Sequence, residues 1–444
     1  MMNKQVDLVK DPVEKLFIGY LLPSVSATMV TSIYVLADTI MIGKGLGADA
    51  IAALNILLPL FSLFFGTGLL FGIGGSVLLS FCFGKGKKSE GNRYFTVALL
   101  CNSLIAILYV LLGEFFFYPI VTALGSTETT LQYIEEYGKI LVIGIPCFMF
   151  SSFLQAFVRN DKAPKHAMIA VIAGGVLNII LDYIFIFILP YGMKGAAAAS
   201  VLGSFTTCII LLFHFWGERN NLKIVKEKWK LSYFYSYAGI ILKNGFSSFL
   251  VEMSSGIIIL LFNIQLLKYA GDIGVTVYTI ISNTAIIVMS LSNGVSQAAQ
   301  PIIAVNHGAG KRERILKVRK IAGITAFSVG LIITLLGILF PKTVIEIFLH
   351  PTKEIMELAP RAILIYFCSF GGMAWNNFYS NYFQAVLKPA KALIICFVRG
   401  IAFSGVLVYL LPIFLKLDGI WLTMPITEIL TLGVVWIMLK KERE

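Results

Sequence analysis

Apolar segments long enough to cross a lipid bilayer recur along this chain from Leu16 to Leu439. A helix needs about 20 residues to cross the hydrocarbon core, and the length and continuity of these segments favour helices over a barrel. Hydrophobic residues make up 58% of the chain and charged residues 14%, whereas soluble proteins have about 45–50% and 25%. The sequence therefore predicts an all-α integral membrane protein.

Basic residues indicate how the predicted spans are oriented. Most of the 36 Lys and Arg residues fall in loops on the same side as the N-terminus. Because cytoplasmic loops carry an excess of Lys and Arg, we expect both termini in the cytoplasm and the chain in the inner (plasma) membrane. The net charge of +12 is then a topology signal whose natural partner is anionic membrane lipid and not nucleic acid. We predict twelve spans, at residues 14–43, 51–82, 93–118, 131–158, 166–189, 194–216, 236–268, 275–305, 317–340, 355–386, 391–414 and 418–439.

The second half of the chain repeats features of the first. Gly-Lys-Gly-Lys at 84–87 recurs as Gly-Ala-Gly-Lys at 308–311, and Gln-Ala at 155–156 recurs at 384–385. Each half has six spans, so both halves enter the membrane from the same side. We expect two six-helix bundles related by a pseudo-two-fold axis along the membrane normal. The predicted domains are an N-lobe at 1–216, a cytoplasmic linker at 217–235 and a C-lobe at 236–444.

Two acids and two polar residues in the first half form the first candidate site. They are Asp38, Asn178, Asp182 and Ser200. Counting residues from the span ends places Asp38, Asp182 and Ser200 in one outer layer of the membrane, and Asn178 lies one helical turn from Asp182 on the same face. An ionised Asp at the centre of a span costs at least ~2.5 kcal/mol, so such acids usually face a polar interior or a substrate path. These hard oxygen ligands suit Na⁺, above all at Asp38, Asn178 and Asp182; without a cation, one carboxyl should hold a proton. The alternative is that hydrogen bonds neutralise each acid separately and both only stabilise packing.

Three more charged residues lie inside predicted spans. Glu252 is a candidate ligand for a cationic substrate or a second proton site. The alternative is that Glu252 is a protonated packing residue. Arg399 and Glu428 lie at similar depths and can meet, and we favour a structural ion pair over one that breaks and reforms during transport.

Aromatic and amide residues gather in the fourth and tenth predicted spans. Aromatic faces attract lipophilic cations, which makes these residues candidates for a substrate cavity, although Phe in a membrane span more often only faces lipid. The candidates are Phe150, Phe153, Gln155, Asn376, Asn377 and Tyr379.

The sequence shows no sign of an enzyme. It has no G-x-x-x-x-G-K-[ST] phosphate-binding motif and no nucleophile–base arrangement, and its four histidines form no metal-ligand set. We expect no cofactor other than a coupling ion, H⁺ or Na⁺.

Three motifs carry a resemblance to a known family. Ala-Asp-Thr-Ile-Met-Ile-Gly at 37–43, and Leu-Asn-Ile-Ile-Leu-Asp at 177–182 followed by Gly-Ala-Ala-Ala-Ala-Ser at 195–200, resemble the multidrug and toxic compound extrusion (MATE) family. The resemblance covers essentially the whole chain, and Arg399 and Glu428 resemble its staphylococcal-type bacterial branch.

The resemblance implies an antiporter that exports amphipathic, often cationic drugs in exchange for H⁺ or Na⁺ while two lobes rock around a central cavity. Its cation site would comprise Asp38, Asn178, Asp182 and Ser200, with Ser200 in place of the usual Thr. Glu252 matches an acid of another branch, which also has an acid in span 10 where this chain has Asn376 and Asn377.

We therefore predict a multidrug efflux antiporter that works by alternating access as a monomer. One alternative is a lipid-linked oligosaccharide flippase of related fold, which would favour a cavity rich in Arg and Lys. A second alternative is a non-transporting membrane scaffold, which would favour a large domain outside the membrane.

Overall fold

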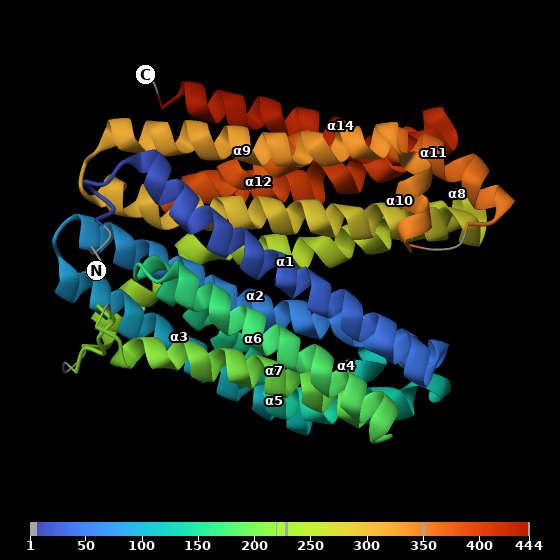
Figure 1. Cartoon of the computed structure of the whole chain (residues 1–444), viewed down its shortest axis with the longest axis horizontal. Helices are drawn as coiled ribbons and strands as arrows, with labels where there is room; N and C mark the ends of the chain where they lie inside the picture. The colour runs from blue at the N-terminus through green and yellow to red at the C-terminus, as the bar shows by residue number, and fades with distance from the viewer. Residues whose placement is uncertain (1–6, 219, 227–229, 349–350, 443–444) are drawn as a thin grey trace. The chain divides into compact units, whose positions relative to one another are not determined.

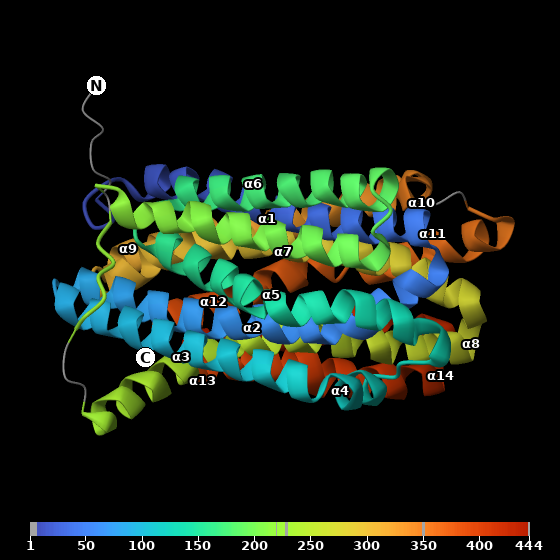
Figure 2. The same cartoon turned by 90° about the horizontal axis from the view of Figure 1, so that it is seen from below.

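The computed structural model describes residues 7–218, 220–226, 230–348 and 351–442, and nearly all of them are helical (Figure 1 and Figure 2). Part of the predicted linker and the predicted loop residues Lys4, Arg219, Lys228, His350 and Arg443 lie outside the described residues. The α-helices are α1 (Val13–Leu46), α2 (Ala48–Gly84), α3 (Lys88–Phe115), α4 (Phe117–Ala123), α5 (Glu128–Asn160), α6 (Pro164–Tyr183), α7 (Gly192–Leu212), α8 (Leu231–Gly308), α9 (Arg312–Leu339), α10 (Pro341–Phe348), α11 (Lys353–Phe367), α12 (Phe370–Ala385), α13 (Pro389–Phe397) and α14 (Ser404–Lys440).

The helices reproduce the predicted spans. Ten stretches of helix within the described residues are long and apolar enough to cross a membrane. Two of them contain a residue with non-helical backbone angles, Gly271 in α8 (φ 59°) and Lys416 in α14 (φ 50°). Both residues fall where the sequence predicts a loop between two spans, so the ten stretches contain twelve spans.

Short π-helical segments occur in two spans that carry buried charged residues, at the end of one span and inside the other. The segment η1 (Ile184–Ile188) begins two residues after Asp182, and η3 (Val398–Phe403) contains Arg399. A π-helix inserts an extra residue into a turn, and such insertions occur frequently at functional sites. The hydrophobic pattern did not predict either segment.

The described chain divides into two compact units, which are considered separately. Unit 1 comprises Met1–Asp11, Leu22–Glu252 and Ala304–Lys311, and unit 2 comprises Pro12–Leu21, Met253–Ile303 and Arg312–Glu444. The start of α1 thus belongs to unit 2, and the start of α8 belongs to unit 1. The predicted lobes and linker, with boundaries at 216 and 236, stay a prediction.

Within unit 1, α2 packs on α3 and α5, and α7 packs on α5 and α6. An apolar core fills the space between α2 and α5, with Leu57, Tyr137 and Met149 fully buried. Within unit 2, α12 packs on α9, α13 and α14, and α11 packs on α14. At the start of α1, Glu14 pairs with Lys317 of α9 at 2.6 Å, a contact internal to unit 2.

The repeated glycine motifs meet each other inside unit 1, where the end of α2 crosses the end of α8. A Cβ atom at Gly84 would lie well under 3.0 Å from the carbonyl oxygen of Val305, and one at Gly308 equally close to that of Phe81. The two contacts are equivalent in the repeat, because the same offset in sequence relates Gly308 to Gly84 and Val305 to Phe81. Each glycine therefore lets one backbone touch the other directly.

We predict that Gly84→Ala and Gly308→Ala each destabilise the protein, and by similar amounts. Each new methyl group would meet a backbone carbonyl, and such overpacking costs about 1–3 kcal/mol. Thermal unfolding in detergent measures the loss, with Gly239→Ala as control because a Cβ there would meet nothing within 4 Å. Equal stability of all three variants would contradict the close contact.

Candidate functional site

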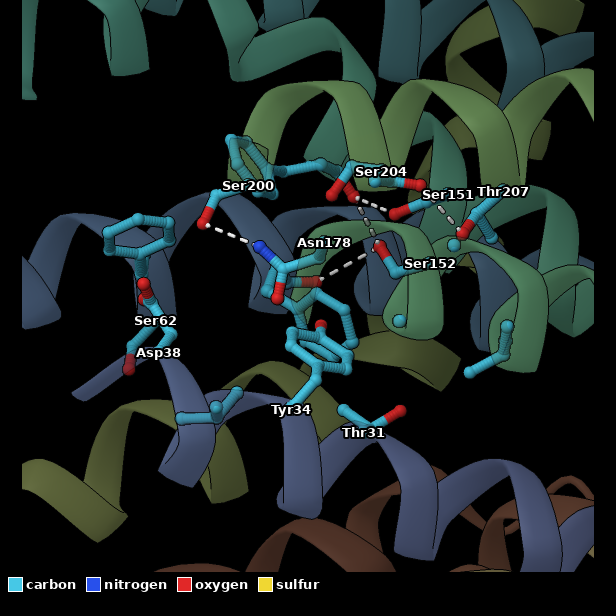
Figure 3. A pocket seen from close by; sticks show the side chains of 18 of the residues that line it. Thr31, Tyr34, Asp38, Ser62, Ser151, Ser152, Asn178, Ser200, Ser204 and Thr207 are labelled. Carbon is cyan, nitrogen blue, oxygen red and sulfur yellow. Dashed lines mark hydrogen bonds between the residues drawn. The ribbon is translucent and has the colours of Figure 1, made fainter. Parts of the chain in front are cut away.

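A cavity of about 240 Å³ with both apolar and polar walls lies within unit 1, between α1, α2, α5, α6, α7 and the start of α8 (Figure 3). Two acids, Asp38 and Glu252, form part of its wall, and no Lys, Arg or His is found among the described residues that line it. Several hydroxyl groups and two amides supply the rest of its polar surface. These polar lining residues are Thr31, Tyr34, Thr39, Ser62, Ser151, Ser152, Gln155, Asn178, Ser200, Ser204 and Thr207.

The structure brings together the four residues of the first candidate site. Asn178 and Asp182 lie one turn apart on the same face of α6, and the Asn178 amide donates to the Ser200 hydroxyl of α7 at 3.4 Å. Asp38 of α1 lines the cavity with Asn178 and Ser200. Asp182 is fully buried and close enough to Asp38 for an electrostatic interaction.

Most of the oxygen atoms in this cluster have no hydrogen-bond donor in the described part of the chain. They are one carboxylate oxygen of Asp38, both of Asp182 and the amide oxygen of Asn178. Buried polar atoms of this kind are normally paired, and an unpaired one costs about 1–3 kcal/mol. Such oxygens in one cluster suit a small hard cation such as Na⁺, or protons on the carboxyl groups. No group of three or more His, Cys, Asp and Glu residues gathers anywhere within the described ranges.

Tyr137 of α5 joins this cluster, although nothing in the sequence singles it out. Its side chain is fully buried, and its hydroxyl lies near Asp38, Asp182 and Ser200. Ser200 is the described side chain within hydrogen-bonding reach of that hydroxyl, and a buried Tyr hydroxyl usually has such a partner. A tyrosine near the start of an apolar span resembles an ordinary interfacial aromatic residue, so only the fold identifies it.

Glu252 faces the same cavity as Asp38. It belongs to the start of α8 that packs in unit 1, and its side chain approaches α2 at Gly66, where a Cβ would lie 3.4 Å from that of Glu252. The cavity therefore has acids on two walls, which favours a positively charged occupant.

The other predicted cavity residues have different surroundings, apart from Gln155, which lines the cavity. Phe153 is fully buried and packs against Phe157, and Phe150 contacts Phe153. In unit 2, Tyr379 packs on Trp375. Asn376 donates to the Glu428 carboxylate at 2.7 Å, and Asn377 donates to Ser292 at 3.0 Å and Asn293 at 2.8 Å. A role for these residues in substrate binding stays a prediction.

Arg399 and Glu428 form the ion pair that their depth suggested. The Arg399 Nε donates to Glu428 Oε1 at 2.7 Å, and the two side chains are 13% and 1% exposed. Asn376 occupies the other carboxylate oxygen of Glu428. Both oxygens are thus satisfied, in contrast to those of Asp182.

We predict that Glu428→Gln destabilises the protein strongly, because it leaves the buried Arg399 charge uncompensated. Removing one partner of a buried pair costs about 3–5 kcal/mol, whereas replacing both by apolar residues is often neutral. Thermal unfolding of Glu428→Gln and of the double variant Arg399→Met/Glu428→Met measures the difference. The control is Glu90→Gln at the exposed Lys87–Glu90 pair, and a Glu428→Gln as stable as this control would refute the analysis.

Solved structures share the fold over nearly the whole chain. An outward-facing multidrug resistance MATE family transporter of the MOP superfamily superposes with a TM-score of 0.91 at 21% identity, covering 99% of this chain and 98% of that one. A MOP superfamily transporter from Pyrococcus furiosus gives a TM-score of 0.89 at 21% identity, with the same coverage. These matches confirm the predicted fold class of twelve membrane-spanning helices in two bundles.

Sequence relatives point to the same family. The multidrug export protein MepA of Staphylococcus aureus is 24% identical over 431 residues, covering 93% of this chain and 90% of MepA. MepA of Staphylococcus saprophyticus is 27% identical over 333 residues, covering 73% of this chain and 72% of that protein. The MatE family model matches residues 23–184 and 246–410. This chain belongs to the MatE family, as its motifs suggested.

Proposed function

We propose that this protein exports amphipathic organic cations in exchange for H⁺ or Na⁺. The observation that carries the proposal is the cluster of unpaired buried oxygens at Asp38, Asn178 and Asp182, next to a cavity whose wall also holds Glu252. The names of the staphylococcal relatives, which are multidrug export proteins, support a drug-like substrate. The acids on two walls support a cationic one.

The shared wall suggests how an ion and a substrate are coupled. A cation or proton bound between Asp38 and Asp182 neutralises negative charge beside the cavity, which weakens the attraction for a cationic substrate held by Glu252. Each ligand therefore favours release of the other. Alternating access turns this competition into exchange, provided that the two conformations differ in affinity for each ligand.

The remaining features of the proposal follow from the sequence. The protein would act as a monomer in the plasma membrane, with both termini in the cytoplasm, membrane lipid around it and no enzymatic step. The flippase alternative is less favoured, because phosphate recognition uses Arg or Lys and neither residue lines the cavity among the described residues. The scaffold alternative leaves the unpaired carboxylate oxygens without a purpose.

We predict that Asp38→Asn and Asp182→Asn each lower ethidium efflux by about 10-fold or more, the size of a typical coupling between sites. An amide has nearly the same shape as the carboxylate but carries no charge for a cation or proton to balance. Efflux from cells that express each variant, with and without Na⁺, measures the effect and identifies the ion.

Asp49→Asn is the matched control, because Asp49 is exposed at the start of α2. Efflux at the wild-type rate in both Asp38→Asn and Asp182→Asn would make the carboxylates structural and the proposal wrong.

A further inference from the structure

A row of polar side chains leads from the candidate cation site along α7. Ser200, Ser204 and Thr207 lie four and three residues apart, so they share one face of the helix. In Figure 3 the labelled side chains run from Asp38 at one end of the cavity to Thr207 at the other. Polar groups thus line the cavity as far as its end nearest the predicted cytoplasmic side of the bundle.

Just beyond the end of α7, on the side that carries Thr207, lies a buried histidine–carboxylate pair. His214 lies seven residues further on, in the short 3-10 helix η2 (Phe213–Trp216), and its Nε2 is 2.8 Å from Asp161 Oδ2, with side chains 4% and 0% exposed. Because a carboxylate only accepts, His214 Nε2 carries a hydrogen. Its Nδ1 is the atom that can take up a second proton, and Asp161 would stabilise the resulting positive charge.

A second histidine connects this pair to the protein surface. The His166 ring centroid is 5.9 Å from that of His214, and His166 Nε2 donates to the carbonyl of Ile210 at 2.7 Å. His166 is half-buried. Three basic residues lie where α5 meets α6, namely Arg159 at the end of α5, Lys162 in the turn and Lys165 at the start of α6.

One apolar layer separates the inner end of the cavity from the histidines. Thr207 donates to the carbonyl of Ala170 at 3.3 Å, and Ala170 and Leu211 are fully buried. Seven helical residues rise by about 10 Å, a gap that a few water molecules could bridge when the bundle opens. A dry layer that is wetted only transiently would keep protons from leaking across the membrane between transport steps.

We propose that His214, held by Asp161, is the proton-transfer residue that links the cavity to the cytoplasmic side. A proton from the cavity is relayed by the hydroxyl groups of Ser204 and Thr207. Transient water molecules then carry it to His214 Nδ1. It then leaves through His166 to water, and His214 returns to its neutral form. This inference rests on the proposed function, with H⁺ as a coupling ion, and on the predicted topology.

The competing explanation is that the pair only fastens the segment after α7. Asn221 donates its backbone N–H and its side-chain amide to Asp161, at 2.8 and 3.0 Å. The backbone N–H groups of Lys223 and Val225 likewise donate to Asn92 and Thr96 at 3.1 and 2.9 Å. This segment is thus held at several points within unit 1. A substitution at one of the other points can therefore weaken its attachment while His214 stays unchanged.

We predict that His214→Gln lowers ethidium transport driven by a pH gradient in proteoliposomes by about 10-fold or more, because positioned proton-transfer groups contribute about 10²–10⁴-fold. Gln can still donate to Asp161 but cannot carry a proton. Ethidium binding at equilibrium should be unchanged. In His214→Ala, which leaves space for a small base, imidazole should restore part of the lost rate, measured against the wild type in the same buffer.

The matched control is Thr96→Val, which removes the acceptor for Val225 but keeps the histidine, and it should transport at the wild-type rate. Wild-type rates in His214→Gln, failure of imidazole to restore His214→Ala, or an equal loss in Thr96→Val would each overturn the inference. Transport by the wild type under a Na⁺ gradient but not under a pH gradient would also overturn it, while leaving the proposed function intact. Absence of transport under either gradient would instead refute the proposed function.

Discussion

Polar atoms inside a membrane-spanning bundle must be satisfied by the protein or by what it binds, and the described structure responds to this constraint in two ways. Around Glu428 the protein supplies both partners, Arg399 and Asn376. Around Asp182 the only amide that interacts with the carboxylate is Asn178, which donates to Ser200, and neither carboxylate oxygen accepts a well-formed hydrogen bond within the described residues. A buried acid without a partner is costly inside the membrane. The difference is consistent with a structural role for Glu428 and supports the proposal that Asp182 takes part in binding a cation or proton.

The local backbone agrees with that assignment at the Asp182 end. The π-helical segment η1 begins two residues after Asp182, so the helix carrying both Asn178 and Asp182 changes its winding just beyond them. The cluster draws on three helices besides α6, with Asp38 from α1, Ser200 from α7 and Tyr137 from α5. A site assembled from separate helices is sensitive to small shifts of any one of them, a property that suits a conformational switch.

The sequence predicted the elements of the fold well and the surroundings of single residues poorly. Twelve apolar segments are a strong signal because the bilayer sets their length, and the breaks at Gly271 and Lys416 fall between predicted spans. The first-half motif brought Asp38, Asn178, Asp182 and Ser200 together correctly. Hydropathy could not separate Gln155, which lines the cavity, from Phe153, which packs in the core, because both residues lie in the same span and differ mainly in which side of the helix they occupy. Nor does hydropathy carry a signal for Tyr137 or for the π-helical segments.

The crossing of α2 and α8 constrains more than packing. Gly84 and Gly308 occupy corresponding positions in the two repeats, and each lies against the backbone that precedes the other. A side chain introduced at either glycine would meet the main chain of the other repeat. No substitution in that repeat can remove the backbone carbonyl that it meets. After an internal duplication, most pairs of corresponding positions are free to diverge, whereas these two restrict each other. Libraries of randomised variants should therefore recover glycine at both positions together, even where the rest of the two motifs has drifted apart.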